Sequence, residues 1–232
     1  MRIVTGVEGN WRILKILDAD PGQQTALAKL GFGADLVQRY PPGTRYFDRA
    51  VANLRQDLDE MVGQSITTGA PPGWAGPLED LLRRAGQARV PVAVVGSTAL
   101  AVRGVNVRPG DIDVITTTEG ADALADAYQE SLVMPVATVP GFGRWSRAFT
   151  RGFRVEWLGN PAKVHEGPWP LAASAWSIAS PFEEIGWENR TLRVPPLEVQ
   201  RRVEAHRGRP DRVAAIDKYR AATAEDGHRS SS

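Results

Sequence analysis

The sequence predicts an α/β fold, in which a small mixed β-sheet is flanked by helices and followed by a C-terminal helical pair. Between residues 78 and 158 the apolar patterns change in the order helix, strand, helix, strand, helix and then strands, which is typical of a mixed sheet with helices beside it. Two further helical patterns, each opened by proline, close the chain. At 232 residues the chain can bury a substantial core, and we expect one globular unit with appendages.

Residues 1–76 are expected to form an N-terminal extension. Its clearest element is residues 45–64, where apolar side chains recur at spacings of three and four, the pattern of a helix with one apolar face. Residues 11–20 are compatible with either a short strand or a helix. Residues 67–77 are rich in glycine and proline, which indicates a linker or a long loop before the next unit.

The central unit, residues 77–195, is expected to hold the sheet. In chain order we expect a helix at 78–86, a strand at 90–96, a helix at 97–104 closed by Gly104, a strand at 111–116, a helix at 121–132, and strands at 134–139, 147–150, 153–158 and 191–194. Thr116 and Glu119 have the spacing of a capping box ahead of the third helix.

The C-terminal segment, residues 196–232, is expected to consist of helices and a tail. Residues 195–208 and 210–224 have helical patterns, and residues 225–232 are expected to fray. The chain therefore ends in a helical pair that follows the sheet.

Composition excludes several kinds of chemistry and of partner. Because the chain has no cysteine, disulfides, thiolate catalysis and cysteine-ligated zinc are excluded. No apolar run approaches the ~20 residues of a membrane helix, and the first residues lack the long apolar stretch of a secretory signal. We therefore expect a cytoplasmic protein with no membrane partner. The formal net charge of +1 indicates no general partner, and nothing in the sequence predicts the oligomeric state.

Two carboxylates, Asp111 and Asp113, lie one residue apart in a segment that otherwise has the pattern of a buried strand. Because side chains alternate along a strand, both carboxylates point to the same face. Neighbouring like charges cost free energy unless a cation lies between them, and oxygen ligands suit Mg²⁺ or Mn²⁺. The alternative is that the pair lies on the exposed polar face of an edge strand.

A third acid, Glu156, also lies within an apolar run. A strand there could lie beside the first and present its carboxylate to the same cluster, which would make a two-metal site. The alternative is an ordinary surface ion pair between Glu156 and Arg151 or Arg154.

Gly96 and Ser97 lie where a strand turns directly into a helix. Backbone amides, a hydroxyl and a helix N-terminus can together hold a phosphate. Ser97 could instead simply cap the helix.

These pieces together resemble a known family. The segments "VVGS", thirteen residues further "DIDV", and later "RVEW" are similar to the signature of the nucleotidyltransferase superfamily typified by DNA polymerase β. The segment "GSTALAVRG…RPGDIDV" is most similar to sequences of a small bacterial branch that includes antibiotic nucleotidyltransferases and abortive-infection nucleotidyltransferase toxins. The resemblance covers about residues 80–220 and leaves about the first 75 unexplained.

The resemblance implies a sheet of the nucleotidyltransferase type and a role for each residue of the signature. Gly96 and Ser97 would contact the triphosphate of an NTP such as ATP. Asp111 and Asp113 would hold Mg²⁺ or Mn²⁺, and Glu156 would be the third ligand and take part in catalysis with them. Arg108 matches an arginine often present in this branch, where it could contact the phosphates or brace its loop.

The sequence also departs from the family. Related chains often have a lysine in the helix after the sheet, whereas this chain has Arg201 and Arg202 there. Its third acid is Glu156 where aspartate is also common, and both residue types can bind magnesium.

Arginine carries most of the positive charge, which favours contact with phosphates and carboxylates. Four arginines precede Glu156 with no acid among them: Arg144, Arg147, Arg151 and Arg154. They could bind a triphosphate or an RNA end, as could the arginine-rich residues 190–212, or both groups could form solvated basic faces. Five tryptophans could stack on bases, although core packing is expected for most of them: Trp145, Trp157, Trp169, Trp176 and Trp187.

The resemblance therefore implies metal-dependent transfer of a nucleoside monophosphate from an NTP to an acceptor hydroxyl, with release of pyrophosphate. The acceptor could be the end of a tRNA or other RNA, a protein in a toxin-antitoxin setting, or a small antibiotic. The alternative is a catalytically silent nucleotidyltransferase fold that binds or regulates a partner. Intact acids at three positions favour the enzyme, because a silent copy has no chemical need to cluster them.

Overall fold

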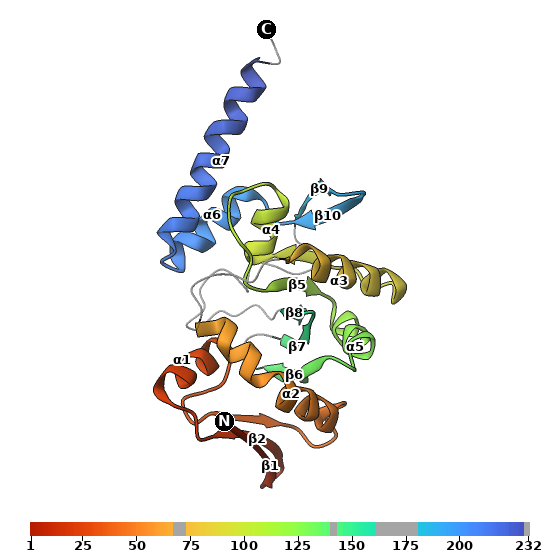
Figure 1. Ribbon diagram of the computed structural model, residues 1–232. Helices are drawn as coiled ribbons and strands as arrows, with labels where there is room; N and C mark the ends of the chain where they lie inside the picture. Colours follow the sequence, from red (N-terminus) through yellow and green to blue (C-terminus); the bar gives the residue numbers. More distant parts are fainter. Residues whose placement is uncertain (67–72, 140–142, 161–180, 230–232) are drawn as a thin grey trace.

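The centre of the molecule is a five-stranded mixed sheet. The computed structural model describes residues 1–66, 73–139, 143–160 and 181–229 (Figure 1). The strands of this sheet lie in the order β4 (Ala93–Val95), β5 (Ile112–Thr116), β8 (Phe153–Gly159), β7 (Gly143–Thr150) and β6 (Leu132–Val139). β5 and β8 are parallel, whereas the other neighbouring strands are antiparallel. The predicted mixed sheet of an α/β fold is confirmed.

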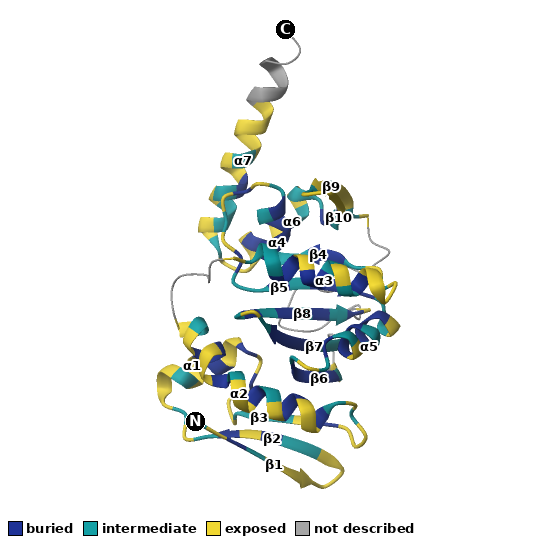
Figure 2. Cartoon of the chain, turned by 45° about the vertical axis from the view of Figure 1, so that its right-hand side comes forward, coloured by how far each residue is buried: buried dark blue, intermediate teal, exposed yellow. Residues whose placement is uncertain are grey.

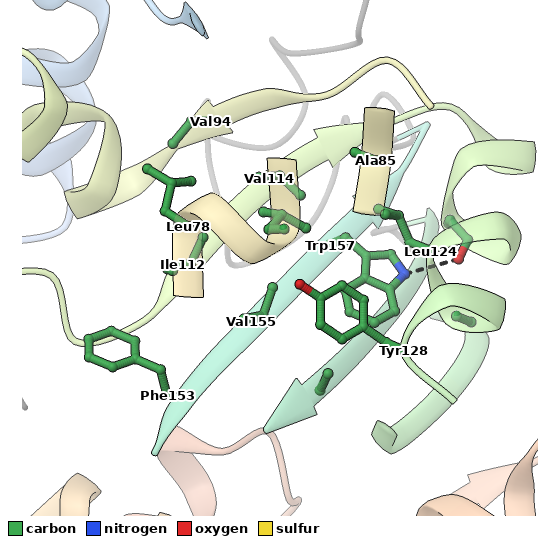
Figure 3. Close-up of a cluster of buried hydrophobic side chains, with 14 of the residues drawn as sticks. Leu78, Ala85, Val94, Ile112, Val114, Leu124, Tyr128, Phe153, Val155 and Trp157 are labelled. Carbon is green, nitrogen blue, oxygen red and sulfur yellow. Dashed lines mark hydrogen bonds between the residues drawn. The ribbon is translucent and has the colours of Figure 1, made fainter. Parts of the chain in front are cut away.

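One face of this sheet is covered by the helices α3 (Ala75–Gln87) and α5 (Thr118–Ala127), as Figure 3 shows for their apolar side chains. Alternate residues of β5 and β8 pack there, and Trp157 is fully buried among them. Its indole N–H donates a hydrogen bond to the Ala121 carbonyl at 3.0 Å. The other residues of these strands therefore face the opposite side of the sheet.

Residues 1–66 form a unit that we call the N-terminal layer. It contains an antiparallel sheet of β1 (Arg2–Glu8), β2 (Trp11–Leu17) and β3 (Val37–Tyr40), together with the helices α1 (Pro21–Lys29) and α2 (Phe47–Ile66). The apolar face of α2 packs into a second core that also contains Val133 and Met134 of β6 and Phe149 of β7. The layer is thus attached to the β6 edge of the central sheet (Figure 1).

The helical pair after the sheet consists of α6 (Leu197–His206) and α7 (Pro210–Arg229), and its presence is confirmed. The short helix α4 (Gly96–Val102) lies near it, and Leu100 of α4 packs against Ile216 of α7. A hairpin of β9 (Glu183–Trp187) and β10 (Arg190–Val194) precedes the pair. α7 extends away from the body of the molecule, and much of its described surface is exposed (Figure 2).

Several predicted elements differ from the structure. Residues 11–17 form a strand, which was one of the two alternatives, while β1, α1, β3 and β9 were not predicted. Residues 75–77 of the predicted linker begin α3, and residues 67–72 lie outside the described part of the chain. Residues 225–229 of the predicted tail continue α7.

The start of α5 also differs from the prediction. Its cap is Thr117, whose hydroxyl accepts a hydrogen bond from the Gly120 amide at 2.9 Å. Thr116 is the last residue of β5 and donates to the Pro91 carbonyl instead. The helix ends at Ala127, and Leu132 begins β6. Among the described helices, none combines the length and the apolar character needed to cross a membrane.

Candidate metal and phosphate site

Three acids meet on the face of the central sheet opposite α3 and α5. Asp113 of β5 lies beside Glu156 of β8 in the parallel register, and Asp111 directly precedes β5. One carboxylate oxygen from each of these three residues lies within 4.8 Å of the others. We call Asp111, Asp113 and Glu156 the acid cluster. The predicted convergence of the three carboxylates is confirmed, and the cluster could hold a metal ion.

Asp113 is the central member of the acid cluster. Its backbone pairs with Val95 of β4 on one side and with Glu156 on the other, so β5 is an interior strand. The alternative in which Asp111 and Asp113 lie on an exposed edge strand is therefore wrong. Burial, and then the negative charges of Asp111 and Glu156, raise the pKa of the Asp113 carboxyl well above its ordinary value, while Arg207 and Arg154 lower it. A further cation beside Asp113 would favour the ionised form.

The turn between β4 and α4 lies against Asp113. Gly96 has a φ of +63°, and a Cβ on it would lie 2.6 Å from the Asp113 Oδ2 atom, so any side chain there would displace the carboxylate. The Gly96 carbonyl accepts a hydrogen bond from the Gln200 side chain of α6 at 3.2 Å. Both restraints hold this turn at the acid cluster.

Ser97 does not cap α4. The cap position is Val95, which makes no side-chain capping bond, and Ser97 is a buried residue of the first helical turn. The next residue, Thr98, donates a hydrogen bond to the Asp111 carbonyl at 2.8 Å, which ties α4 to the start of β5. The simple capping interpretation of Ser97 is therefore wrong.

The four arginines before Glu156 do not form one cluster. Arg144 pairs with Asp122 of α5, and Arg151 lies in the turn between β7 and β8. Arg154 lies 3.2 Å from Asp111, whereas Arg147 lies 2.7 Å from Glu156. Strand alternation and the turn separate residues that are close in the sequence.

The ion-pair partner of Glu156 was not predicted. The sequence suggested Arg151 or Arg154, but the partner is Arg147, which lies opposite Glu156 in the antiparallel register of β7 and β8. A basic residue inside an apolar strand was the available signal. The sequence does not reveal the register that brings the two residues together.

Within the described residues, the other candidate phosphate contacts form no ion pair or hydrogen bond with the acid cluster. Arg108 is exposed, and within the described part of the chain it makes no hydrogen bond or ion pair. Arg201 pairs with Asp217 of α7 through two contacts of 2.6 and 2.9 Å. Arg202 is exposed on α6.

The tryptophans have different surroundings. Trp157 belongs to the core, and Trp187 stacks on Trp74 with ring centroids 5.9 Å apart. Trp145 borders the acid cluster, because its indole nitrogen lies 3.3 Å from a Glu156 oxygen. Trp169 and Trp176 lie outside the described residues.

The fold and the site define an α/β protein in which three carboxylates on a mixed sheet could hold a metal ion beside a glycine turn. No protein-family model matches the chain, and no curated protein matches it. A Thermotoga maritima protein, whose structure was solved as that of a candidate nucleotidyltransferase, is 19% identical with a TM-score of 0.46. The match covers 66% of this chain and 96% of that protein.

The antibiotic-resistance factor ANT(2'')-Ia is a second similar structure, with 16% identity and a TM-score of 0.38. This match covers 66% of the present chain and 95% of that factor. Both are similarities of backbone structure at low sequence identity, and neither assigns a role to a residue of this chain.

Proposed function

We propose that this chain is a nucleotidyltransferase that uses a divalent metal ion to transfer a nucleoside monophosphate from an NTP to an acceptor hydroxyl. The observation that carries the proposal is the meeting of Asp111, Asp113 and Glu156 beside the turn at Gly96. Three acids this close together are costly in the absence of a cation. They have a chemical use where phosphates and metal ions must be held together.

The acid cluster fits Mg²⁺ or Mn²⁺ by the chemistry of its donors. All three ligands are carboxylate oxygens, which suit these ions better than they suit zinc or copper. Burial and the two neighbouring acids raise the pKa of the Asp113 carboxyl, so a bound cation would favour its ionised form. Bound divalent ions would neutralise negative charge on the phosphates and lower the pKa of the attacking hydroxyl.

The residues of the site divide into two roles. Asp111, Asp113 and Glu156 would hold the metal ions, with Glu156 also close to the acceptor hydroxyl. The backbone at Gly96 and Ser97 would hold the triphosphate, because no side chain at Gly96 blocks its approach to Asp113. Arg108 is exposed and available to the outer phosphates.

In the proposed reaction the acceptor oxygen attacks the α-phosphorus in line with the bond to the leaving pyrophosphate. A new phosphorus–oxygen bond forms to the acceptor, the bond to pyrophosphate breaks, and the hydroxyl proton is released. The acceptor classes remain an RNA or tRNA end, a protein as in toxin-antitoxin systems, and a small molecule such as an antibiotic.

The test is incubation with Mg²⁺ and each of the four α-labelled NTPs, with total cellular RNA as acceptor. We expect label in RNA or in the protein itself, and none with Asp111→Ala/Asp113→Ala. Asp122→Asn is the matched control, because it removes a carboxylate that pairs with Arg144 outside the acid cluster. Label that persists in the double variant would contradict the proposed role of the acids.

One observation favours a second candidate function. Arg154 and Arg147 already pair with Asp111 and Glu156, as they would in a structural ion-pair network of a silent binding fold. Thermal denaturation with Mg²⁺ and each NTP separates the two functions, because a ligand that binds only the native state raises its stability. Stabilisation that disappears in Asp113→Ala supports the enzyme, whereas no shift with any nucleotide and no label supports the silent fold.

A further inference from the structure

Two side chains of β7 hold the carboxylate of Glu156. The Arg147 Nε and Nη2 atoms lie 2.9 and 2.7 Å from Glu156 Oε1. The Trp145 indole N–H is directed at the other oxygen, Oε2, at 3.3 Å. The Arg147 guanidinium also lies 5.0 Å from the centre of the Trp145 ring, so the two holding groups contact each other. Both oxygens of Glu156 are therefore oriented by the neighbouring strand.

The N-terminal layer holds the Arg147 side chain in place. Arg147 is only 2% exposed, and its Nη1 atom donates to the Leu30 carbonyl at 2.6 Å. Leu30 is the residue that ends α1, more than a hundred positions earlier in the chain. One buried guanidinium thus joins the N-terminal layer to the acid cluster.

The Trp145 ring also packs against the N-terminal layer. Gly31 has a φ of +82°, and a Cβ added to it would lie 3.2 Å from the Cη2 atom of the Trp145 ring. The segment Leu30–Gly31 therefore contacts both side chains that hold Glu156, one through a carbonyl and the other through close packing.

Arg154 differs from Arg147 at the opposite side of the acid cluster. It has one contact of 3.2 Å to Asp111, and its buried Nε atom has no hydrogen-bond partner within the described part of the chain. Arg147 uses all three of its nitrogens, on Glu156 and on the Leu30 carbonyl. This difference marks Arg147 as the arginine with a fixed geometry.

We infer that Arg147 is a positioning residue that orients Glu156, and that the segment Leu30–Gly31 fixes Arg147 and Trp145 in place. The N-terminal layer is then part of the candidate active site. The consequence for turnover depends on the proposed function, whereas the consequence for metal binding depends only on the acid cluster being a metal site.

Removal of the guanidinium has two opposite effects under this inference. Arg147 competes with a metal ion for the negative charge of Glu156, so its loss strengthens metal binding. It also restricts the orientations of Glu156, so its loss slows a reaction that needs this carboxylate in one place. An arginine that only stabilised the fold would not produce tighter metal binding together with slower turnover.

The first experiment compares the wild type with Arg147→Met by Mn²⁺ titration without nucleotide, following free Mn²⁺ by electron paramagnetic resonance. We expect several-fold tighter binding in the variant. At saturating Mn²⁺ we expect kcat to fall by about tenfold or more, with KM for the NTP unchanged. Arg147→Lys restores the charge without the planar guanidinium, so its Mn²⁺ affinity should return toward the wild type while kcat stays low.

Arg144→Met is the matched control, because Arg144 lies on the same strand but pairs with Asp122 of α5, outside the acid cluster. It should change neither Mn²⁺ affinity nor kcat. Unchanged Mn²⁺ affinity and kcat in a folded Arg147→Met protein would overturn the inference.

The second experiment perturbs the N-terminal layer without touching the acid cluster. Gly31→Ala places a methyl group against Trp145. Gly9→Ala is the control, because Gly9 also has a positive φ, of +56°, and a Cβ added to it would have no described neighbour within 4 Å. We expect a lower kcat only in Gly31→Ala. Equal kcat in the two glycine variants would contradict the role of Leu30–Gly31, even if Arg147→Met failed to fold.

Failure of the proposed function gives a different result. If the wild type transfers no label and Asp111→Ala/Asp113→Ala binds Mn²⁺ as the wild type does, the acid cluster is not a metal site. If the wild type is active and binds Mn²⁺ through these acids, the Arg147 and Gly31 variants test only whether Arg147 and the N-terminal layer position Glu156.

Discussion

The two faces of the central sheet carry opposite chemistry although the same strands build them. On one face Ile112 and Val114 of β5 pack with Val155 and Trp157 of β8 in the main core. On the other face Asp113, Glu156 and Arg147 lie in a row across β5, β8 and β7. Apolar burial contributes roughly 25 cal/mol per Å², whereas neighbouring carboxylates oppose folding. The comparison indicates that the apolar face of β5 and β8 stabilises the fold, whereas their opposite face gathers the charged side chains of the proposed site.

The largest stability effect is expected on the apolar face. Trp157→Ala should lower the free energy of unfolding by about 3–5 kcal/mol, because it empties a fully buried site that stacks on Tyr128 with ring centroids 5.5 Å apart. Urea denaturation followed by circular dichroism measures the loss. Trp187→Ala is the control, since Trp187 is only half-buried, and it should lose less than half as much. Because Trp187 packs against the edge of the same core, equal losses would contradict the expected advantage of full burial.

The next effect lies where the turn at Gly96 meets the charged face. Gly96→Ala should cost about 1–3 kcal/mol of unfolding free energy, because its positive φ disfavours a side chain and the new Cβ would displace the Asp113 carboxylate. Gly9→Ala shares the positive φ without a described neighbour and should cost about 1 kcal/mol. Mn²⁺ should stabilise Gly9→Ala as it stabilises the wild type and should stabilise Gly96→Ala less. Identical responses to Mn²⁺ would contradict the close approach of this turn to a metal site.

A smaller effect of opposite sign is expected at Asp113. Asp113→Asn should raise the free energy of unfolding by about 0.5–2 kcal/mol in metal-free buffer, since it removes a charge that burial and two acids disfavour. It should also abolish stabilisation by Mn²⁺. Asp122→Asn removes a carboxylate that is paired with Arg144, so it should not stabilise the protein. Destabilisation by Asp113→Asn would mean that the charged face contributes to folding.

The smallest effect is a pH dependence of this difference. Because the pKa of Asp113 is higher in the folded protein than in the unfolded chain, the folded state binds more protons, and stability falls as pH rises from the unfolded pKa toward the folded pKa. The stability advantage of Asp113→Asn over the wild type should therefore be absent below pH 3.8, the ordinary pKa of an aspartate, and grow as pH rises above it. Urea denaturation of both proteins at several pH values, without metal, measures this advantage. An advantage that shrinks with rising pH would contradict the direction of the shift.

Sequence reasoning recovered the elements that have strong periodicity. The amphipathic helix α2, the strands β5 and β8 and the helical pair α6 and α7 were all predicted, because their apolar residues repeat with the period of the element. The N-terminal strands β1 and β3 were missed, and β2 was left open between a strand and a helix. Their alternation is interrupted by Gly6 and Lys15, and their pairing depends on residues distant in the chain.

The acid cluster was predicted for a similar reason, and its surroundings were not. Asp111 and Asp113 share a face by strand geometry alone, and a strand at Glu156 could be recognised locally. The pairs formed by Arg147 and Arg154 depend on how the strands are aligned. A shift of one residue in this register would turn the side chains of a strand to the other face of the sheet. The four arginines therefore looked like one basic cluster in the sequence, whereas in the structure Arg147 and Arg154 border the acid cluster and Arg144 pairs with Asp122 of α5.

The sequence by itself determined the residue types, the periodicity of the main elements and the shared face of Asp111 and Asp113, because these follow from local geometry. The position of Glu156 beside Asp113 depends on the pairing of β5 with β8. Only the tertiary structure decided that Arg147 pairs with Glu156 and that Leu30–Gly31 lies behind this pair. The contacts of Leu30–Gly31 with Arg147 and Trp145 join residues more than a hundred positions apart. They depend on how the N-terminal layer packs on β6 and β7, and packing between distant segments is set by the complementary shapes of whole surfaces.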